Sequence, residues 1–260
     1  MQHRKNWDRD QLLVAFMLYC QLPFGKLHSR NPEIIKYAKL IDRTPSALAM
    51  KLTNIASLDP AITETGRKGL KGASSLDKAM WNEMQSNWGK FVEDAEKVLN
   101  YISNKLEVEE IGKQVDEKES NHIGMTRLAI TKTRIGQHFF RASVLSAYDG
   151  KCCISGLSNS SLLIASHILP WKDDETNRLN PRNGLALSAL HDKAFDLGMI
   201  AIDEEMKVVV SHKYFDDKDE FYNQSIKAFE GRMITLPKKF SPDQRFLEFH
   251  RENIFEKREV

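Results

Sequence analysis

Apolar residues recur at the spacing of an α-helix in three places within the first sixty residues. In DRDQLLVAFMLYCQL, residues 8–22, an acidic start precedes apolar residues at positions 12, 13, 16, 17 and 20, and a proline ends the run. A second helix is predicted over residues 32–41, because Asn31 can serve as its N-cap and a proline follows it. A third helix begins with the same pattern at Thr44-Pro45.

A longer helix is predicted from Ser75 to about Leu106, where aromatic and aliphatic residues repeat on one face. Residues 107–124 are different: they are rich in charge, poor in aromatic residues and without periodicity, which is typical of an exposed linker. The pattern therefore predicts an all-helical domain over residues 1–106, a charged linker, and a second domain over residues 125–260.

The second domain combines strands with helices. The segment LLIASHI, residues 162–168, should place His167 on the opposite face to Ser166 if it forms a strand. After a polar loop, GLALSAL can return antiparallel to it, and HDKAFDLG reads as a helix. Such a ββα unit would bring His167 close to the helix start that carries His191 and Asp192, with Asn183 at the loop.

Helices and a second hairpin surround this unit in the pattern. A helix is predicted to end at the Asp149-Gly150 turn. The segment MIAIDEEMKVVVSH predicts a β-hairpin, and a last helix is predicted over QRFLEFHRENIF after a cap at residues 241–243. His250 and Arg251 of that helix are predicted to be structural. The predicted fold class is therefore α+β.

Composition agrees with two soluble domains. The chain has 260 residues, of which 41% are hydrophobic and 28% charged. No apolar run approaches the roughly 20 residues of a membrane span, and the N-terminus lacks the apolar core of a signal peptide. Three cysteines, two of them adjacent at Cys152 and Cys153, make a poor disulfide framework. We therefore expect a cytoplasmic protein with no membrane partner.

The net charge of +2 is unevenly distributed. Residues 1–72 contain 12 Lys or Arg and 6 Asp or Glu, which indicates a polyanionic partner for the N-terminal domain. The helices at 32–41 and 45–58 are close enough for a helix-turn-helix, whose second helix would present Lys51 and Asn54 to DNA. A helical bundle with a solvated basic face explains the same pattern.

Two other groups of basic residues are candidates for contacts with nucleic-acid phosphates. The glycine-rich segment GRKGLKGAS contains Arg67, Lys68 and Lys71, and a flexible exposed turn is the competing interpretation. In the predicted helix that opens the second domain, Arg134 and Arg141 could contact phosphates or form an ordinary polar helix face.

The strongest signal is the order of motifs from residue 162 to residue 203. Ser-His-Ile and Pro-Trp are followed by Asn-Pro-Arg-Asn-Gly-Leu and then by Leu-His-Asp-Lys-Ala-Phe-Asp. This order resembles the HNH endonuclease family with its ββα-metal core, and is closest to its bacterial restriction-type members. The resemblance is specific over residues 140–203 and extends more loosely to the N-terminal helical segment and to RFLEFHRENIF.

The resemblance implies a role for each matching residue. His167 would be the general base, since an imidazole can accept a proton near neutral pH. Asn183 would orient that base or fix the catalytic loop. His191 or Asp192 would hold one divalent cation, magnesium or manganese, and His191 would also belong to the catalytic set. We prefer His191 for the family's final histidine position, although alignment through Phe195 favours Asp192.

Two details depart from the family. Many members have an aspartate metal ligand immediately before the base, where Ser166 stands here, so Asp173 or Asp174 are further candidates for the cation. A structural zinc is also common in the family. Because Cys152 and Cys153 are adjacent and Ser188 and His191 make a poor second pair, we expect no structural zinc.

The implied function is hydrolysis of double-stranded DNA by a metal-dependent, type II restriction-like or phage-defence endonuclease of bacterial type. A non-catalytic DNA-binding regulator that keeps the ββα unit as a scaffold is the main alternative, and RNA is a third possibility as the substrate. Paired cuts in a duplex need two active sites, so a homodimer is compatible with this function.

Overall fold

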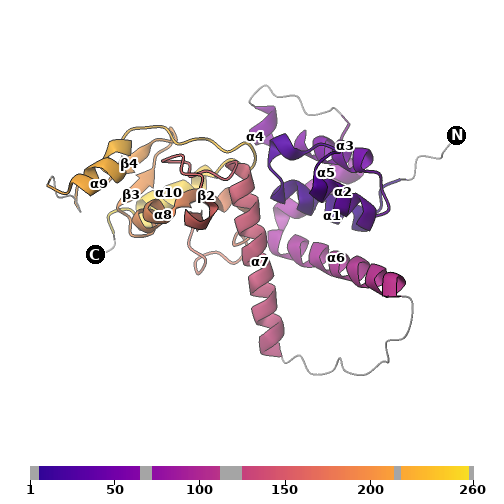
Figure 1. Ribbon diagram of the computed structural model, residues 1–260. Coiled ribbons are helices and arrows are strands. Elements are labelled where there is room, and N and C mark those ends of the chain that lie inside the picture. Colours follow the sequence, from indigo (N-terminus) through magenta and orange to yellow (C-terminus); the bar gives the residue numbers. More distant parts are fainter. Residues whose placement is uncertain (1–5, 65–71, 112–124, 214–217, 258–260) are drawn as a thin grey trace. The chain divides into compact units, whose positions relative to one another are not determined.

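The computed structural model describes residues 6–64, 72–111, 125–213 and 218–257, with backbone alone for 105–111 and 125–133 (Figure 1). The chain forms two compact units, unit 1 from Met1 to Phe139 and unit 2 from Phe140 to Val260. Their boundary lies inside helix α7 (Met125–Ala147), whereas the sequence pattern predicts a linker before residue 125. Each unit is described below by itself.

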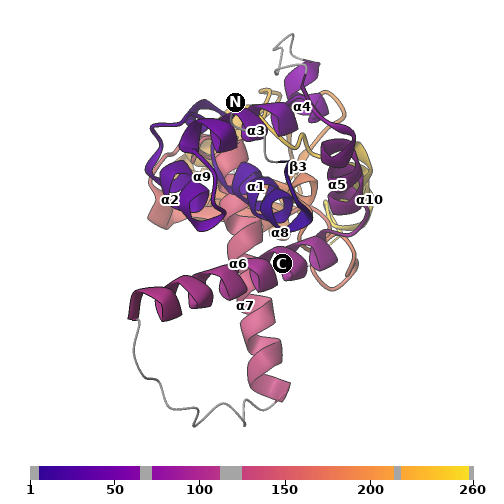
Figure 2. The same cartoon turned by 90° about the vertical axis from the view of Figure 1, so that its right-hand side faces the viewer.

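Helix α1 (Arg9–Gln21) is the centre of unit 1. Asp8 and Gln11 form a capping box at its start, as the acidic residues there suggest. Every residue from Gln11 to Cys20 is buried, because the run LLVAFMLYC is apolar on all sides and can be covered only by surrounding helices. Helices α3, α5 and α6 contact it, and Figure 2 shows them around α1.

The predicted caps determine where the neighbouring helices begin. Asn31 accepts a hydrogen bond from Glu33 N at the start of α2, and Thr44 accepts one from Ala47 N at the start of α3, which confirms both predictions. The bounds in this part of the chain are η1 Phe24–Lys26, α2 Pro32–Leu40, α3 Pro45–Ala56 and α4 Pro60–Thr63.

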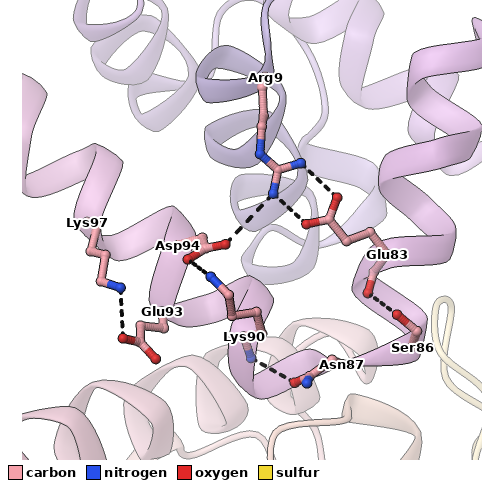
Figure 3. Close-up of polar contacts among 8 residues, drawn as sticks. All are labelled: Arg9, Glu83, Ser86, Asn87, Lys90, Glu93, Asp94 and Lys97. Atoms are coloured by element: carbon pink, nitrogen blue, oxygen red, sulfur yellow. Dashed lines mark hydrogen bonds and ion pairs between the residues drawn. The ribbon is translucent and has the colours of Figure 1, made fainter.

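The single helix predicted for residues 75–106 is wrong. It is divided into α5 (Ser75–Ser86) and α6 (Trp88–Ile111) by Asn87, whose φ of −155° and ψ of 88° are not helical. The Asn87 side chain accepts a hydrogen bond from Lys90 N at 2.8 Å, so it caps α6. Arg9 spans the break, since it bonds Glu83 of α5 and lies 3.8 Å from Asp94 of α6 (Figure 3).

Unit 2 contains the predicted ββα arrangement. Strands β1 (Leu163–His167) and β2 (Gly184–Ser188) pair antiparallel, with His167 opposite Gly184. Helix α8 (Ala189–Asp196) follows directly and contacts both strands. Its N-cap is Ser188, so the helix begins two residues before the predicted start at His191.

The rest of unit 2 covers this arrangement. The predicted hairpin is present as β3 and β4, and the predicted last helix is α10, with Asp243 as its N-cap. The mixture of helices and two small antiparallel sheets confirms the α+β class. The bounds are η2 Ser160–Leu162, η3 Pro181–Asn183, β3 Ile200–Ile202, β4 Val208–Val210, α9 Glu220–Ser225, η4 Lys227–Phe229 and α10 Gln244–Asn253.

Two glycines allow the elements of unit 2 to approach closely. A Cβ on Gly184 would lie 2.4 Å from Val144 Cγ2, so only glycine lets β2 lie against α7. Gly198 has a φ of +71°, and a Cβ there would lie 2.1 Å from the carbonyl oxygen of Ile254. These contacts fix β2 and the segment after α10 in their places.

Among the residues described, none of the helices combines the length and the apolar character needed to cross a membrane.

Candidate active site

A cavity of about 340 Å³ lies at the end of β1 in unit 2. Its wall comes from β1, the loop that follows, α8 and α10, which are far apart in the sequence. The polar and aromatic side chains in this wall are Ser166, His167, Trp171, Asp192, Asp196 and His250. The cavity therefore collects two imidazoles and two carboxylates in one place.

His167 is held on three sides. Its Nε2 lies 2.9 Å from the carbonyl oxygen of Arg178, so Nε2 carries the proton and donates it. The ring stacks on Phe140, with centroids 3.9 Å apart, and meets the edge of Trp171 at 5.4 Å. In the neutral ring Nδ1 is then the atom that can accept a proton, and it has no hydrogen-bond partner among the described residues.

The surroundings of His167 also favour its neutral form. Burial lowers the pKa of His167 below its ordinary value of 6.5, while the hydrogen bond to Arg178 and the charge of Asp192 oppose this shift. A lowered pKa means that His167 is unprotonated near neutral pH. It is therefore a base ready to accept a proton.

Asn183 is buried and fixes the loop between the two strands. Its Oδ1 accepts a hydrogen bond from Leu169 N at 2.8 Å, and its Nδ2 donates to the carbonyls of Leu169 and Asn177 at 3.1 and 3.3 Å. Arg178, which holds His167, is the next residue along this loop. The contacts are those of a residue that fixes the loop, the second of the two roles expected for Asn183.

Asp192 shares the cavity with His167 and is half-buried. Burial raises the pKa of Asp192, while Ser166, Lys193 and His167 oppose that shift. The buried Ser166 hydroxyl is near enough to lower this pKa without completing a hydrogen bond of its own. A partly desolvated carboxylate beside a neutral base is suited to binding a cation.

His191, which the sequence analysis preferred to Asp192, has different surroundings from His167. Its Nδ1 lies 2.9 Å from Ser188 Oγ and 3.5 Å from Cys152 Sγ, and its Nε2 donates to the carbonyl of Ser225 at 2.9 Å. It is buried and does not line the cavity that contains His167. Both ring nitrogens are engaged, so His191 has a structural environment and Asp192 is the better candidate for the cation.

Cys152 completes this second group of polar residues. Burial alone would raise the pKa of Cys152, but hydrogen bonds from His191 and Ser155 bring it to about 6. Cys152 and its neighbour Cys153 are both buried in the apolar core of unit 2. The group Cys152, Ser188 and His191 joins the loop after α7 to the start of α8.

Asp173 and Asp174 do not line the cavity. The Asp174 carboxylate accepts hydrogen bonds from Thr176 N and from the backbone and side chain of Asn177, which shape the loop. Asp173 is exposed. Neither is therefore placed beside His167 and Asp192 in this structure.

The basic residues predicted to bind DNA have very different environments. Lys51 is buried and pairs with Asp77, at 2.8 Å from Nζ to Oδ1, so it is not part of an exposed basic face. Arg141 donates to the carbonyls of Leu163 and Ser160, whereas Arg134 is exposed. Asn54 is half-buried in α3. Arg67, Lys68 and Lys71 lie outside the described residues.

Four residues of the site were missed by sequence reasoning. Asp196 could have been found, because it lies four residues after Asp192 on the same helix face. Trp171 belongs to the Pro-Trp motif but was given no role, and Arg178 had no signal, since its contribution to the base is its backbone carbonyl. His250 was assigned a structural role and reaches the cavity from α10.

Together these features define a class of site. An imidazole at the end of the first strand, a buried asparagine before the second strand and a carboxylate on the following helix lie together in one ββα unit. A sequence profile of the HNH endonuclease family matches residues 152–203, which contain all three. This segment of the chain is therefore similar to the HNH endonuclease family. A search among curated protein sequences found no significant match.

Proposed function

We propose that this protein is a metal-dependent endonuclease that hydrolyses phosphodiester bonds of double-stranded DNA. The observation that carries the proposal is the state of His167: its Nε2 is bound to a carbonyl, it is neutral near pH 7, and it shares a cavity with Asp192. Hydrolysis of a phosphodiester requires an activated water and a site for positive charge near the phosphate. The cavity offers one residue for each need.

One particular ring nitrogen of the proposed base, His167, accepts the proton. Because Nε2 donates to Arg178, Nδ1 of His167 takes the proton of the attacking water. The proton placed on the ring is stabilised by the negative charge of Asp192, which raises the pKa of His167. Asn183 supports this step indirectly, since it holds the loop that provides the carbonyl of Arg178.

The donor set fits a hard divalent cation. Among the described residues, no three His, Cys, Asp or Glu side chains converge closely enough to hold a metal ion. Magnesium and manganese need few protein ligands, because one or two carboxylates together with water and substrate phosphate complete their shell. Asp192 would hold such an ion, with Asp196 as a second carboxylate in the wall. The ion would offset the phosphate charge and stabilise the leaving oxygen.

A restriction or phage-defence role, of type II character, is part of the proposal. The helices α2 and α3 and the excess of basic residues in residues 1–72 support a DNA-binding function of unit 1. Asn54, Arg67, Lys68, Lys71 and Arg134 remain its candidate contacts, while Lys51 and Arg141 are omitted because their charged groups bond other parts of the fold. Cutting both strands would be the work of a homodimer.

Incubation of the full chain with supercoiled plasmid tests the proposal. We expect nicked or linear DNA with magnesium or manganese, none with a chelator, and none with the variant His167→Ala. Plasmid that is bound but uncut under all conditions would support the DNA-binding regulator instead. Structured RNA in the same buffer tests the choice of polymer, and unmodified against modified phage DNA tests the defence role.

A further inference from the structure

His250 connects the last helix to the helix that carries the carboxylates. It is 1% exposed, and its ring lies nearly parallel to that of Phe195, with centroids 3.6 Å apart and planes 11° apart. Its Nε2 lies 3.0 Å from the carbonyl oxygen of Phe195, so Nε2 is the donor. The same side chain lines the cavity that contains His167.

The carbonyl that His250 binds belongs to the last turn of α8. This carbonyl accepts a hydrogen bond from Gly198 N at 2.9 Å in the turn that follows the helix, and His250 adds a second donor that comes from α10. Phe195 lies between Asp192 and Asp196, which both line the cavity. Through this bond and the ring stacking, His250 ties the last turn of α8 to α10, and with it the helix face from which both carboxylates project.

The last helix does not depend on His250 for its own place. Arg251 donates to the carbonyl of Ile202 at 3.0 Å, and Glu256 N donates to the carbonyl of Gly198 at 3.0 Å. At the start of α10, Asp243 N donates to the carbonyl of Arg182 at 3.1 Å. These three hydrogen bonds join α10 and its ends to β3, to the turn after α8 and to the loop before β2. Of the four contacts described, that of His250 is the one made to α8 itself.

We propose that His250 is a positioning residue of the nuclease site: through the Phe195 carbonyl it holds Asp192 and Asp196 in the cavity wall beside His167. This inference rests on the proposed nuclease function. His250 touches neither the attacking water nor the reacting phosphate in this scheme, and it acts by fixing the carboxylates that bind the cation. Residues that orient metal ligands in this way contribute about 10- to 100-fold to metal affinity or activity.

The test compares His250→Ala and His250→Gln with the matched control Arg251→Ala in the full chain. Arg251 lies on the same helix and donates to a backbone carbonyl of β3 instead of α8. We expect His250→Ala to lower kcat about 10- to 100-fold with a nearly unchanged KM for DNA. His250→Gln keeps an N–H donor near the position of Nε2 and should recover most of that loss. Arg251→Ala should lower Tm and leave kcat near that of the wild type.

Manganese binding, measured by calorimetry in the cleavage-silent His167→Ala background, gives a readout independent of cutting. We expect weaker binding with His250→Ala and unchanged binding with Arg251→Ala. If His250→Ala changes only Tm, as Arg251→Ala does, His250 is purely structural and the inference is wrong. If the wild type binds manganese but cuts no polymer, the proposed function fails, while manganese affinity still decides the role of His250. Should His250→Ala fold poorly, His250→Phe, which can keep the stacking on Phe195 but cannot donate to its carbonyl, carries the same comparison.

Discussion

Two histidines of unit 2 share one hydrogen bond to a backbone carbonyl but differ in the surroundings of their second ring nitrogen. In both His167 and His191, Nε2 lies 2.9 Å from a backbone carbonyl, that of Arg178 in one and that of Ser225 in the other. The difference is at Nδ1. In His191 it is bound by Ser188 and Cys152, whereas His167 lies in the wall of a cavity with Asp192. A histidine in a family motif is therefore available for catalysis only where its second nitrogen is not used by the fold.

The largest effect should come from replacing the base. We expect His167→Ala to reduce cleavage about 10²- to 10⁴-fold, the usual contribution of a general base. Single-turnover cleavage of a labelled duplex measures this, and circular dichroism checks that the fold is intact. Cleavage within a few-fold of the wild-type rate would remove His167 from the mechanism and with it the contrast between the two histidines.

Replacement of the carboxylate should separate activity from stability. Asp192→Asn should lower cleavage about a hundredfold, because a ligand of the cation is lost. The pKa of Asp192 is raised by burial, so its ionised form costs stability above that pKa. The amide removes this cost, and we expect the free energy of unfolding at neutral pH to rise by about 0.5 kcal/mol. Urea unfolding measures the change, and a loss of stability would contradict the assignment.

Replacement of His191 should lower stability and leave cleavage nearly unchanged. His191→Ala removes a buried side chain and leaves the half-buried carbonyl of Ser225 without its donor, and we expect a loss of about 1 to 3 kcal/mol of stability. Cleavage measured well below the melting temperature should be nearly normal. A fully folded His191→Ala variant that cannot cut DNA would break the comparison and restore His191 to the catalytic set.

The smallest effect concerns pH. Because burial lowers the pKa of His167, the base is lost only as pH falls through a value below 6.5. The cleavage rate should be measured from about pH 5 to about pH 8. At about pH 6.5, the ordinary pKa of histidine, the rate should exceed half of its plateau value. Asp192→Asn removes a charge that raises this pKa, so its acid limb should move to still lower pH. A midpoint above the ordinary value would show that another group limits the rate.

Local signals predicted the elements of the fold well. Caps at Asp8, Asn31 and Thr44 mark three helix starts correctly, and the two apolar runs LLIASHI and GLALSAL predicted the antiparallel pairing of β1 with β2. The break at Asn87 was missed because apolar spacing continues on both sides of it, although Asn87 and the nearby Gly89 are both poor helix formers. Its cause includes contacts of Arg9 with both helices, which are distant in the sequence.

The sequence named the residues of the candidate site, but it did not show which side chain of α8 faces the cavity. Adjacent helical residues differ by about 100° around the axis, so a family motif alone could not decide between His191 and Asp192. The decision depends on where α8 begins, and Ser188 sets that by capping the helix. Asn183 and His167 were easier, because a strand end and the loop beside it leave less freedom. The contribution of His250 depends on tertiary packing, which no local pattern reports.

The tight contact of Gly198 with Ile254 gives the domain an order of assembly during synthesis. The contact joins the turn after α8 to a residue 56 positions later, and His250 reaches Phe195 across a similar length of chain. A growing chain releases its N-terminal parts first, so β1, β2 and α8 leave the ribosome before α10 exists. Until translation passes residue 254, the wall of the cavity is incomplete. The cavity that contains His167 is therefore completed only after the segment of α10 has been synthesised.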